Sequence, residues 1–202
     1  MEWSDARRKG LDIAVSEAVC QGIELDRAAA AVRVHLEVLT LPPEGPPPAE
    51  RRVTIVLDDV GRIAASLRAQ KWDDLEPTVF PLDLDTLAPT VASYGGGELH
   101  GWEFFDLPDS SWTQWRELLS LDTTLGGGGR GGDRPHLLEL SQQEGIDPRE
   151  LDIRIWFGAL TVLDGSGAEI PIDEFIAGGQ RWWDAHNQCD PRATADGVAP
   201  PL

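Results

Sequence analysis

The strongest constraint on the fold of this chain is the alternation of apolar and polar residues between positions 31 and 41. Val32, Val34, Leu36 and Val38 fall on one side of this segment, and Arg33, His35 and Glu37 fall on the other. Because the side chains of a β-strand point alternately to its two faces, this period predicts a half-buried strand. The proline-rich residues that follow end the pattern and predict an exposed loop over residues 42–50.

Other parts of the chain also have the composition of strands. Residues 51–69 contain two apolar stretches on either side of Asp58, Asp59, Val60 and Gly61, which predicts an antiparallel hairpin that turns at these four residues. Further strands are predicted at 98–106, 136–140 and 151–164. Residues 164–167 predict a turn, after which residues 168–172 return as the second strand of another hairpin.

Four segments are typical of helices. They are residues 5–21, a short stretch near Asp85, residues 110–121, and a final segment from Asp173 toward Trp182 and Trp183. In the first segment apolar residues recur at helical spacing, and Gly22 follows where a helix would end. Prolines interrupt residues 71–94, so we expect the helix near Asp85 to lie within a long ordered loop.

Together these elements predict an α+β fold, with antiparallel β-sheets, a few short flanking helices and long ordered loops. We expect a single domain over residues 1–190 and a flexible tail over residues 191–202. A two-fold β substructure, with halves at 1–94 and 95–190, stays open as an alternative. It is suggested by the resemblance of residues 153–162 to residues 32–41, in which Arg154 matches Arg33.

The net charge disfavours whole classes of partner. The 202 residues include 35 acidic and 17 basic ones, which gives a formal net charge of −18. A field of this sign repels nucleic-acid phosphates and anionic membrane surfaces, and it attracts basic proteins. We therefore expect a protein partner with a basic surface, and no nucleic-acid or membrane partner.

The sequence also suggests where the protein is located. No apolar run approaches the roughly 20 residues that span a bilayer, and the first residues carry mixed charges without the apolar core of a secretory signal. Cys20 and Cys189 are far apart and form no CxxC pair, which favours free thiols in a reducing compartment over the alternative of a disulfide between them. We expect a cytoplasmic protein. Its preference for arginine over lysine suggests a bacterial source with high GC content.

Several segments match part of a functional motif but lack an essential residue. The glycine-rich residues 126–133 have no lysine or hydroxyl where a phosphate-binding loop needs them, which favours a flexible loop. Residues 162–173 place Val162 at the first ligand position of an EF-hand and Glu169 at its apolar position, which favours a plain hairpin turn. The four histidines have no metal-ligand spacing. We predict no catalytic residue, no metal site and no cofactor.

A local polar cluster supports an alternative interpretation. On a strand, Glu98 and His100 would share one face, with Glu103 on the opposite face. A pocket formed by Glu98, His100 and Trp102 is the site that an enzyme or a small-ligand-binding protein would use.

The eight tryptophans suggest a binding surface, because tryptophan is a favoured anchor at protein interfaces. Trp156 faces outward if Ile153, Ile155 and Phe157 face the core. Trp182 and Trp183 are adjacent on a helix and point about 100° apart, so at most one of them should be central to the same core. We expect at least one of these three tryptophans to be exposed.

These observations favour a non-enzymatic, acidic interaction protein that docks a basic protein partner. Immunity-like or antitoxin-like proteins and accessory subunits of bacterial assemblies have such properties, although this link is one of analogy. The candidate binding residues are Trp156, Trp182, Trp183, Glu98, His100 and Trp102. The alternative is the enzyme or small-ligand-binding protein with its pocket near His100, and a weaker one is carbohydrate binding on a tryptophan platform.

Overall fold

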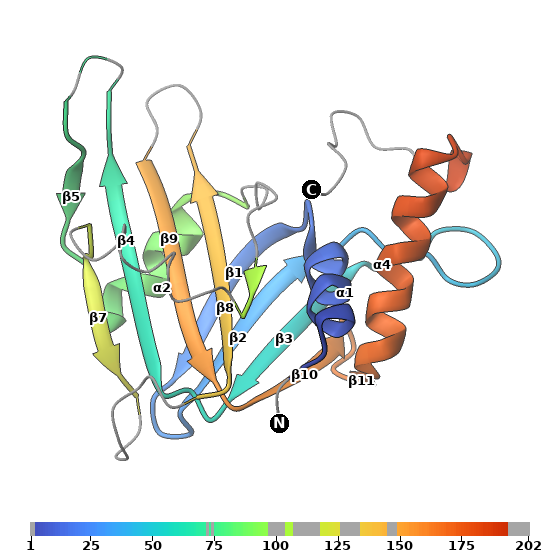
Figure 1. Ribbon diagram of the computed structural model, residues 1–202, viewed down its shortest axis with the longest axis horizontal. Coiled ribbons are helices and arrows are strands. Elements are labelled where there is room, and N and C mark those ends of the chain that lie inside the picture. Colours follow the sequence, from blue (N-terminus) through green and yellow to red (C-terminus); the bar gives the residue numbers. More distant parts are fainter. Residues whose placement is uncertain are drawn as a thin grey trace.

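Two antiparallel sheets with helices at their margins form the protein (Figure 1). The structure, a computed structural model, describes residues 3–71, 73, 75–96, 104–106, 118–125, 134–144 and 149–193. The predicted α+β class with antiparallel sheets is confirmed. In the part of the chain that the structure describes, no helix has the length and apolar character needed to cross a bilayer.

Sheet A contains the strand predicted from the alternation. In spatial order it consists of β1 (Val19–Asp26), β2 (Ala31–Glu37), β3 (Arg52–Asp58), β10 (Ala159–Asp164) and β11 (Glu169–Ile170). Strands β10 and β11 form the hairpin predicted around residues 164–167. Gly167 adopts a φ of +86° in this turn, a conformation that glycine adopts without strain.

Sheet B lies against the other side of the core. Its order is β5 (Thr78–Phe80), β4 (Arg62–Ala69), β9 (Arg149–Phe157), β8 (His136–Gln143) and β6 (Phe104–Phe105), and β7 (Leu121–Thr124) also pairs with β4. The predicted helix over residues 110–121 is wrong at its end, because residues 118–120 are not helical and Leu121 begins β7. Pairing with β4 overrides the helical spacing there. Residues 110–117 lie outside the described residues.

The predicted hairpin at Asp58–Gly61 is also wrong. Strand β3 pairs with β10 in sheet A, whereas β4 pairs with β9 in sheet B. The two pairs therefore form one long antiparallel ribbon that bends from one sheet into the other, at the lower edge of Figure 1. For the same reason, residues 151–164 form two strands that are separated at Gly158.

The side chains at the bend explain its shape. Val60 is fully buried, and its N–H donates to Ala30 O at 2.8 Å. Gly61 N–H donates to Trp156 O at 2.9 Å, so the connection is tied to both sheets. A Cβ on Gly158 would lie 2.6 Å from Asp59 Oδ2, so a glycine lets the two crossing segments approach.

The first helix is shorter than predicted. Helix α1 (Asp5–Val15) begins at Ser4, whose side chain accepts a hydrogen bond from Arg7 N. It ends before Glu17, which has a φ of +57°, and β1 begins two residues later. A register shift between Cys20 and Gly22 interrupts the alternation of β1, which hides the strand in the sequence.

Helix α1 packs closely against the final helix, α4 (Ile172–Asn187), at one side of sheet A (Figure 1). A Cβ on Gly179 would lie 2.6 Å from Ala14 Cα, and a Cβ on Gly10 would lie 2.6 Å from Ile176 Cγ2. Gly179, which weakens α4 as an isolated helix, and Gly10 of α1 thus allow the two helices to approach closely. The predicted C-terminal helix is confirmed.

The short helix predicted near Asp85 is present as α2 (Leu84–Ser93). Asp83 caps it, and Asp83 and Thr86 form a reciprocal capping box. Leu87 and Val91 enter the main core, and the helix packs against β1.

Strands of the two suggested halves pair with each other, because β3 pairs with β10 and β4 pairs with β9. In the segment predicted as a flexible tail, Pro191–Ala193 form a 3-10 helix with Ala193 buried. The rest of that segment lies outside the described residues.

Candidate functional site

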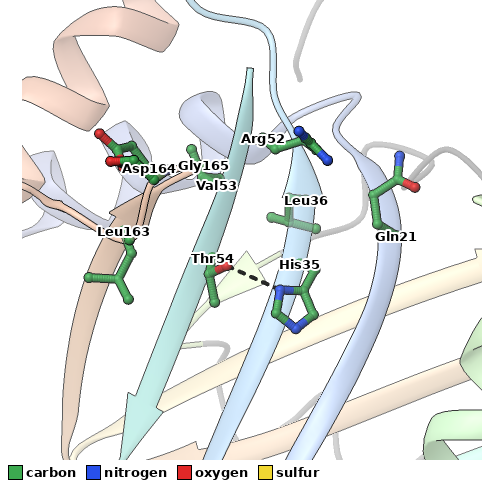
Figure 2. Close-up of a pocket in the computed structure, with 11 residues that line it drawn as sticks. Gln21, His35, Leu36, Arg52, Val53, Thr54, Leu163, Asp164 and Gly165 are labelled. Carbon is green, nitrogen blue, oxygen red and sulfur yellow. Dashed lines mark hydrogen bonds between the residues drawn. The ribbon is translucent and has the colours of Figure 1, made fainter. Parts of the chain in front are cut away.

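The outer face of sheet A carries a hollow of about 500 Å³ (Figure 2). It extends from β1 across β2 and β3 to the turn after β10. The side chains that line it include Gln21, His35, Arg52, Thr54, Leu163 and Asp164. His35 and Thr54 are cross-strand partners, and Thr54 in turn lies opposite Leu163, so one row of residues crosses three strands.

A chain of polar groups runs along this face. His35 Nδ1 lies 3.1 Å from Thr54 Oγ1, at hydrogen-bond distance. His35 Nε2 lies 3.4 Å from Glu24 Oε1, within ion-pair distance but without hydrogen-bond geometry. A carboxylate, an imidazole and a hydroxyl are therefore aligned across β1, β2 and β3, the order of groups that can activate a hydroxyl nucleophile.

Asp164 provides a fixed negative charge at the rim of the hollow. Its Oδ1 accepts hydrogen bonds from Ser166 N at 2.8 Å, Ser166 Oγ at 2.6 Å and Ala168 N at 3.0 Å. The hydrogen bond from the Ser166 hydroxyl, together with those from the backbone, lowers the pKa of Asp164 below its ordinary value. None of the hydrogen bonds described for Asp164 uses Oδ2.

The cation at the hollow is already neutralised. Arg52 Nε donates to Glu50 Oε1 at 2.9 Å, and Arg52 Nη2 donates to Glu50 Oε2 at 2.5 Å. This bidentate pair lowers the pKa of Glu50 to about 2. Asp164 adds a carboxylate to the lining of the hollow, whereas the nearby Glu24 lies opposite Arg33 on β2.

Internal pairing of arginines extends over the whole described part of the chain. Ion pairs with carboxylates are formed by Arg7, Arg8, Arg27, Arg51, Arg52, Arg62, Arg68, Arg134, Arg149, Arg154, Arg181 and Arg192. Among the described arginines only Arg33 forms no ion pair with a described carboxylate. Exposed carboxylates such as Glu44, Asp58 and Asp184 have no such cation partner among the described residues. The excess of acid is therefore a property of the surface.

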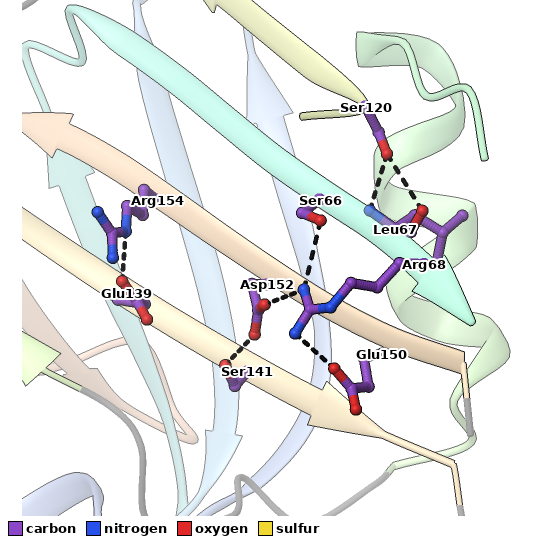
Figure 3. A network of polar contacts seen from close by, with 9 residues as sticks. All are labelled: Ser66, Leu67, Arg68, Ser120, Glu139, Ser141, Glu150, Asp152 and Arg154. Atoms are coloured by element: carbon purple, nitrogen blue, oxygen red, sulfur yellow. Dashed lines mark hydrogen bonds and ion pairs between the residues drawn. The ribbon is translucent and has the colours of Figure 1, made fainter. Parts of the chain in front are cut away.

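The outer face of sheet B is also polar (Figure 3), and several of its polar side chains are buried. Arg154 is 3% exposed and pairs with Glu139 on the neighbouring strand. Burial raises the pKa of Glu139 above its ordinary value, against the opposing effect of Arg154. The pairing satisfies both buried charges, as a structural ion pair requires.

A second group of charges lies on the same face. Arg68 binds Asp152 and Glu150, and Ser141 donates a hydrogen bond to Asp152. Burial alone would lower the pKa of Arg68, but the carboxylates of Asp152 and Glu150 raise it overall. Because both carboxylates contact the same guanidinium on neighbouring strands, we interpret this network as structural.

The candidate tryptophans are less accessible than expected. Trp182 and Trp183 are each 3% exposed and belong to a second apolar cluster with Leu41, Ala185 and Ala193. The expectation that at most one of the adjacent pair would be central to one core is wrong. Their rings contact each other edge to face, and Trp183 Nε1 donates to Ile13 O at 3.2 Å. Helix α1 and the 3-10 helix Pro191–Ala193 both pack against α4 and bury these two tryptophans.

Trp156 is half-buried on the outer face of sheet B. The Arg62 guanidinium lies 4.8 Å from the centre of its ring, a cation–π arrangement. It is the most accessible of the three tryptophans.

Glu98, His100 and Trp102, the predicted pocket, lie outside the described residues. Sequence reasoning placed His35 on a polar strand face, but it did not find the hollow, which is formed by residues from four separate segments. Asp164 was placed in the predicted turn at residues 164–167 and in the rejected EF-hand loop, and it was not considered as a binding residue. Among the described residues, no group of three His, Cys, Asp or Glu side chains could hold a metal ion.

The exposed large apolar residues of the described part are Leu75, Val79 and Phe80, on or near the edge strand β5. Pro77 and Pro81 flank this three-residue strand, and acidic residues lie on both sides of it. Short length, prolines and charge are the features that protect sheet edges from pairing. We interpret β5 as a protected edge.

Comparison with known proteins adds no relative: no protein-family model, no curated protein and no solved structure matches the chain.

Proposed function

We propose that this chain is a non-enzymatic, acidic interaction protein that docks a basic protein partner. The observation that carries the proposal is the internal pairing of its arginines, which leaves the surplus carboxylates as the surface charge. A surface of one sign steers an oppositely charged partner and repels nucleic acid. In this proposal the protein acts in the cytoplasm, as an immunity-like or antitoxin-like protein or as an accessory subunit of a bacterial assembly, and its acidic surface binds a basic protein.

Capture followed by kinetics tests the proposal. The tagged full chain is incubated with a lysate of the source organism at low salt, and the retained proteins are identified by mass spectrometry. The association rate constant of the purified partner is then measured while the Debye length falls from about 30 Å at 0.01 M salt to about 3 Å at 1 M. We expect a basic partner whose association slows steeply with salt. A rate constant that does not change with salt contradicts the proposal.

A charge-reduced variant provides the matched comparison. Glu44→Gln, Asp58→Asn and Asp184→Asn together remove three exposed charges that take part in no described ion pair. We expect this triple variant to fold normally and to associate about threefold or more slowly at low salt, because electrostatic steering can raise such rates by 10-fold to 1,000-fold. At high salt the variant and the parent should associate at the same rate.

A second candidate function is supported by the aligned groups of Glu24, His35 and Thr54. In this proposal the chain is an enzyme or a small-ligand-binding protein, with its pocket at His35 in place of the one expected near His100. A fluorophosphonate probe should then label Thr54, with fluoride as the leaving group and His35 accepting the hydroxyl proton. Labelling that is absent, or that persists in both Thr54→Val and His35→Asn, contradicts this candidate.

A further inference from the structure

We propose that the hollow on the outer face of sheet A receives a lysine or arginine side chain of the basic partner. The inference rests on the docking function proposed above and adds to it the place where a basic residue binds. It is carried by the shape of the hollow, by the charge at its rim and by the acceptor groups that line it (Figure 2).

The charges around the hollow favour a cation. Arg52 is held by both oxygens of Glu50, so this pair contributes no net charge. Glu50 also packs against the turn after β10, because a Cβ on Gly165 would lie 2.9 Å from Glu50 Cγ. Asp164 then adds, at the same rim, a carboxylate that forms no ion pair with any described residue. An anion would find only the Arg52 guanidinium, which Glu50 already neutralises, whereas a cation is attracted by the net negative charge of the rim.

The lining groups match the donors of a basic side chain. The hydrogen bonds described within the turn use Oδ1 of Asp164, so Oδ2 can accept a hydrogen bond from a ligand. Thr54, Ser166 and Gln21 each contribute a further oxygen that can accept a hydrogen bond. An ammonium group brings three donors and a guanidinium brings five, with no acceptor. Leu163 provides an apolar surface for the methylene groups of either side chain.

Other surfaces of the described residues fit a basic residue less well. A smaller cavity of about 250 Å³ is lined mainly by apolar groups, including Pro42, Pro43 and Phe175. Its cation, Arg181, is held by Leu41 O and Glu174, so no unpaired charge attracts a partner there. The edge strand β5 is protected, and the buried charges of sheet B, those of Glu139, Asp152 and Arg154, lie in ion pairs.

Nuclear magnetic resonance of the full chain tests the inference with a single blocked lysine. The probe is Nα-acetyl-lysine N-methylamide, and the corresponding norleucine compound is the uncharged control. We expect amide shifts concentrated at Thr54, Ser166 and Gly167 with the lysine probe and none with norleucine. Asp164→Asn keeps the Oδ1 acceptor of the turn but replaces Oδ2 by an amide donor.

We expect Asp164→Asn to weaken binding of the lysine probe about fivefold, the upper range for a solvent-accessible ion pair. Asp184→Asn removes the same charge from an exposed position on α4 and should change binding less than twofold. Gln21→Leu provides a second variant that removes an acceptor outside the turn, and it should weaken binding in the same direction. The variants are compared at equal salt.

The outcomes separate the site from the function. Shifts that spread over the acidic surface, or equal losses in Asp164→Asn and Asp184→Asn, overturn the hollow as the site. If the captured partner nevertheless associates in a salt-dependent way, the docking function stands and its surface lies elsewhere. If the lysine probe enters the hollow but no basic partner is captured, the docking function fails while the cation site stands.

Discussion

Arg33 and Arg154 occupy matching positions in the two similar ten-residue segments, yet they lie in opposite environments. Arg33 is half-buried on the outer face of sheet A and forms no ion pair with a described carboxylate. Arg154 is 3% exposed on the outer face of sheet B and pairs with Glu139. In both strands the residues on either side of the arginine face the core. The local alternation therefore tells which side chains face away from the core, but not whether water reaches them.

This difference assigns different roles to the two faces. A buried charge must be paired, so sheet B uses its polar residues to satisfy one another. On sheet A, the side chains of His35, Thr54 and Asp164 instead line a surface hollow, although His35 Nε2 itself is buried. Binding is for this reason expected on the outer face of sheet A and not on that of sheet B.

The largest difference is expected for the two arginines. Arg154→Leu leaves the carboxylate of Glu139 buried without its cation, which should lower the free energy of unfolding by about 3–5 kcal/mol. Arg33→Leu should lower it by less than about 0.5 kcal/mol, because a partly solvated side chain without an ion pair contributes little. Urea denaturation monitored by tryptophan fluorescence measures both.

A double variant separates the charge effect from general damage to the sheet. Glu139→Met combined with Arg154→Leu removes both charges, and its stability should return to within about 1 kcal/mol of the parent. If the double variant is as unstable as Arg154→Leu, lost packing and not the unpaired carboxylate explains the effect. If both single arginine variants lose equal stability, the contrast between the faces is wrong.

Removing one hydroxyl from each face gives a smaller difference. Ser141→Ala takes a donor from the buried Asp152 carboxylate and should lower stability by about 2 kcal/mol, the range for hydrogen bonds to charged groups. Thr54→Val should change stability by about 0.5 kcal/mol or less, because water can replace the contact with the half-buried His35. If urea denaturation shows the same loss of unfolding free energy for both variants, water reaches the two faces to the same extent.

How far the sequence predicted the fold depends on whether a contact is local. The alternation of β2, the β10–β11 hairpin and the C-terminal helix α4 were predicted because each depends on neighbouring residues in the chain. The hairpin predicted at residues 58–61 was wrong, because the strands on either side of it, β3 and β4, pair instead with β10 and β9, about 100 residues away in the chain. One local signal was overlooked: Val60 is a poor turn residue, and its apolar side chain is buried.

The candidate site was less predictable than the fold. His35 could be assigned to a polar face, but the hollow around it requires the β3–β10 pairing that the predicted hairpin excluded. The adjacent Trp182 and Trp183 were expected to point about 100° apart, with at most one of them central to the same core. Both are nevertheless buried, because separate elements cover the two sides of α4. Helical geometry gives the direction of a side chain, whereas burial depends on what packs there.

The smallest of these effects is expected at Asp12, between the two environments. Asp12 Oδ1 accepts a hydrogen bond from Phe105 N at 3.0 Å, which ties α1 to the edge of sheet B. Burial raises the pKa of Asp12 from 3.8 to about 6, against the opposing effect of that hydrogen bond. The folded protein therefore binds a proton more tightly than the unfolded chain does, and this group makes the protein less stable as the pH rises from about 4 to about 6.

Asp12→Asn keeps an acceptor for Phe105 N but removes the partly buried charge. At pH 7 it should raise the free energy of unfolding by about 1 kcal/mol, a value reduced for solvent screening because the side chain is only partly buried. Below pH 4 the gain should disappear, since Asp12 is then protonated in both states. Urea denaturation across this range measures the difference from the parent, with Asp184→Asn as the exposed control. A gain that is the same at pH 4 and pH 7 would mean that burial does not disfavour the charged form of Asp12. Water would then reach this part of α1 as readily as it reaches the outer face of sheet A.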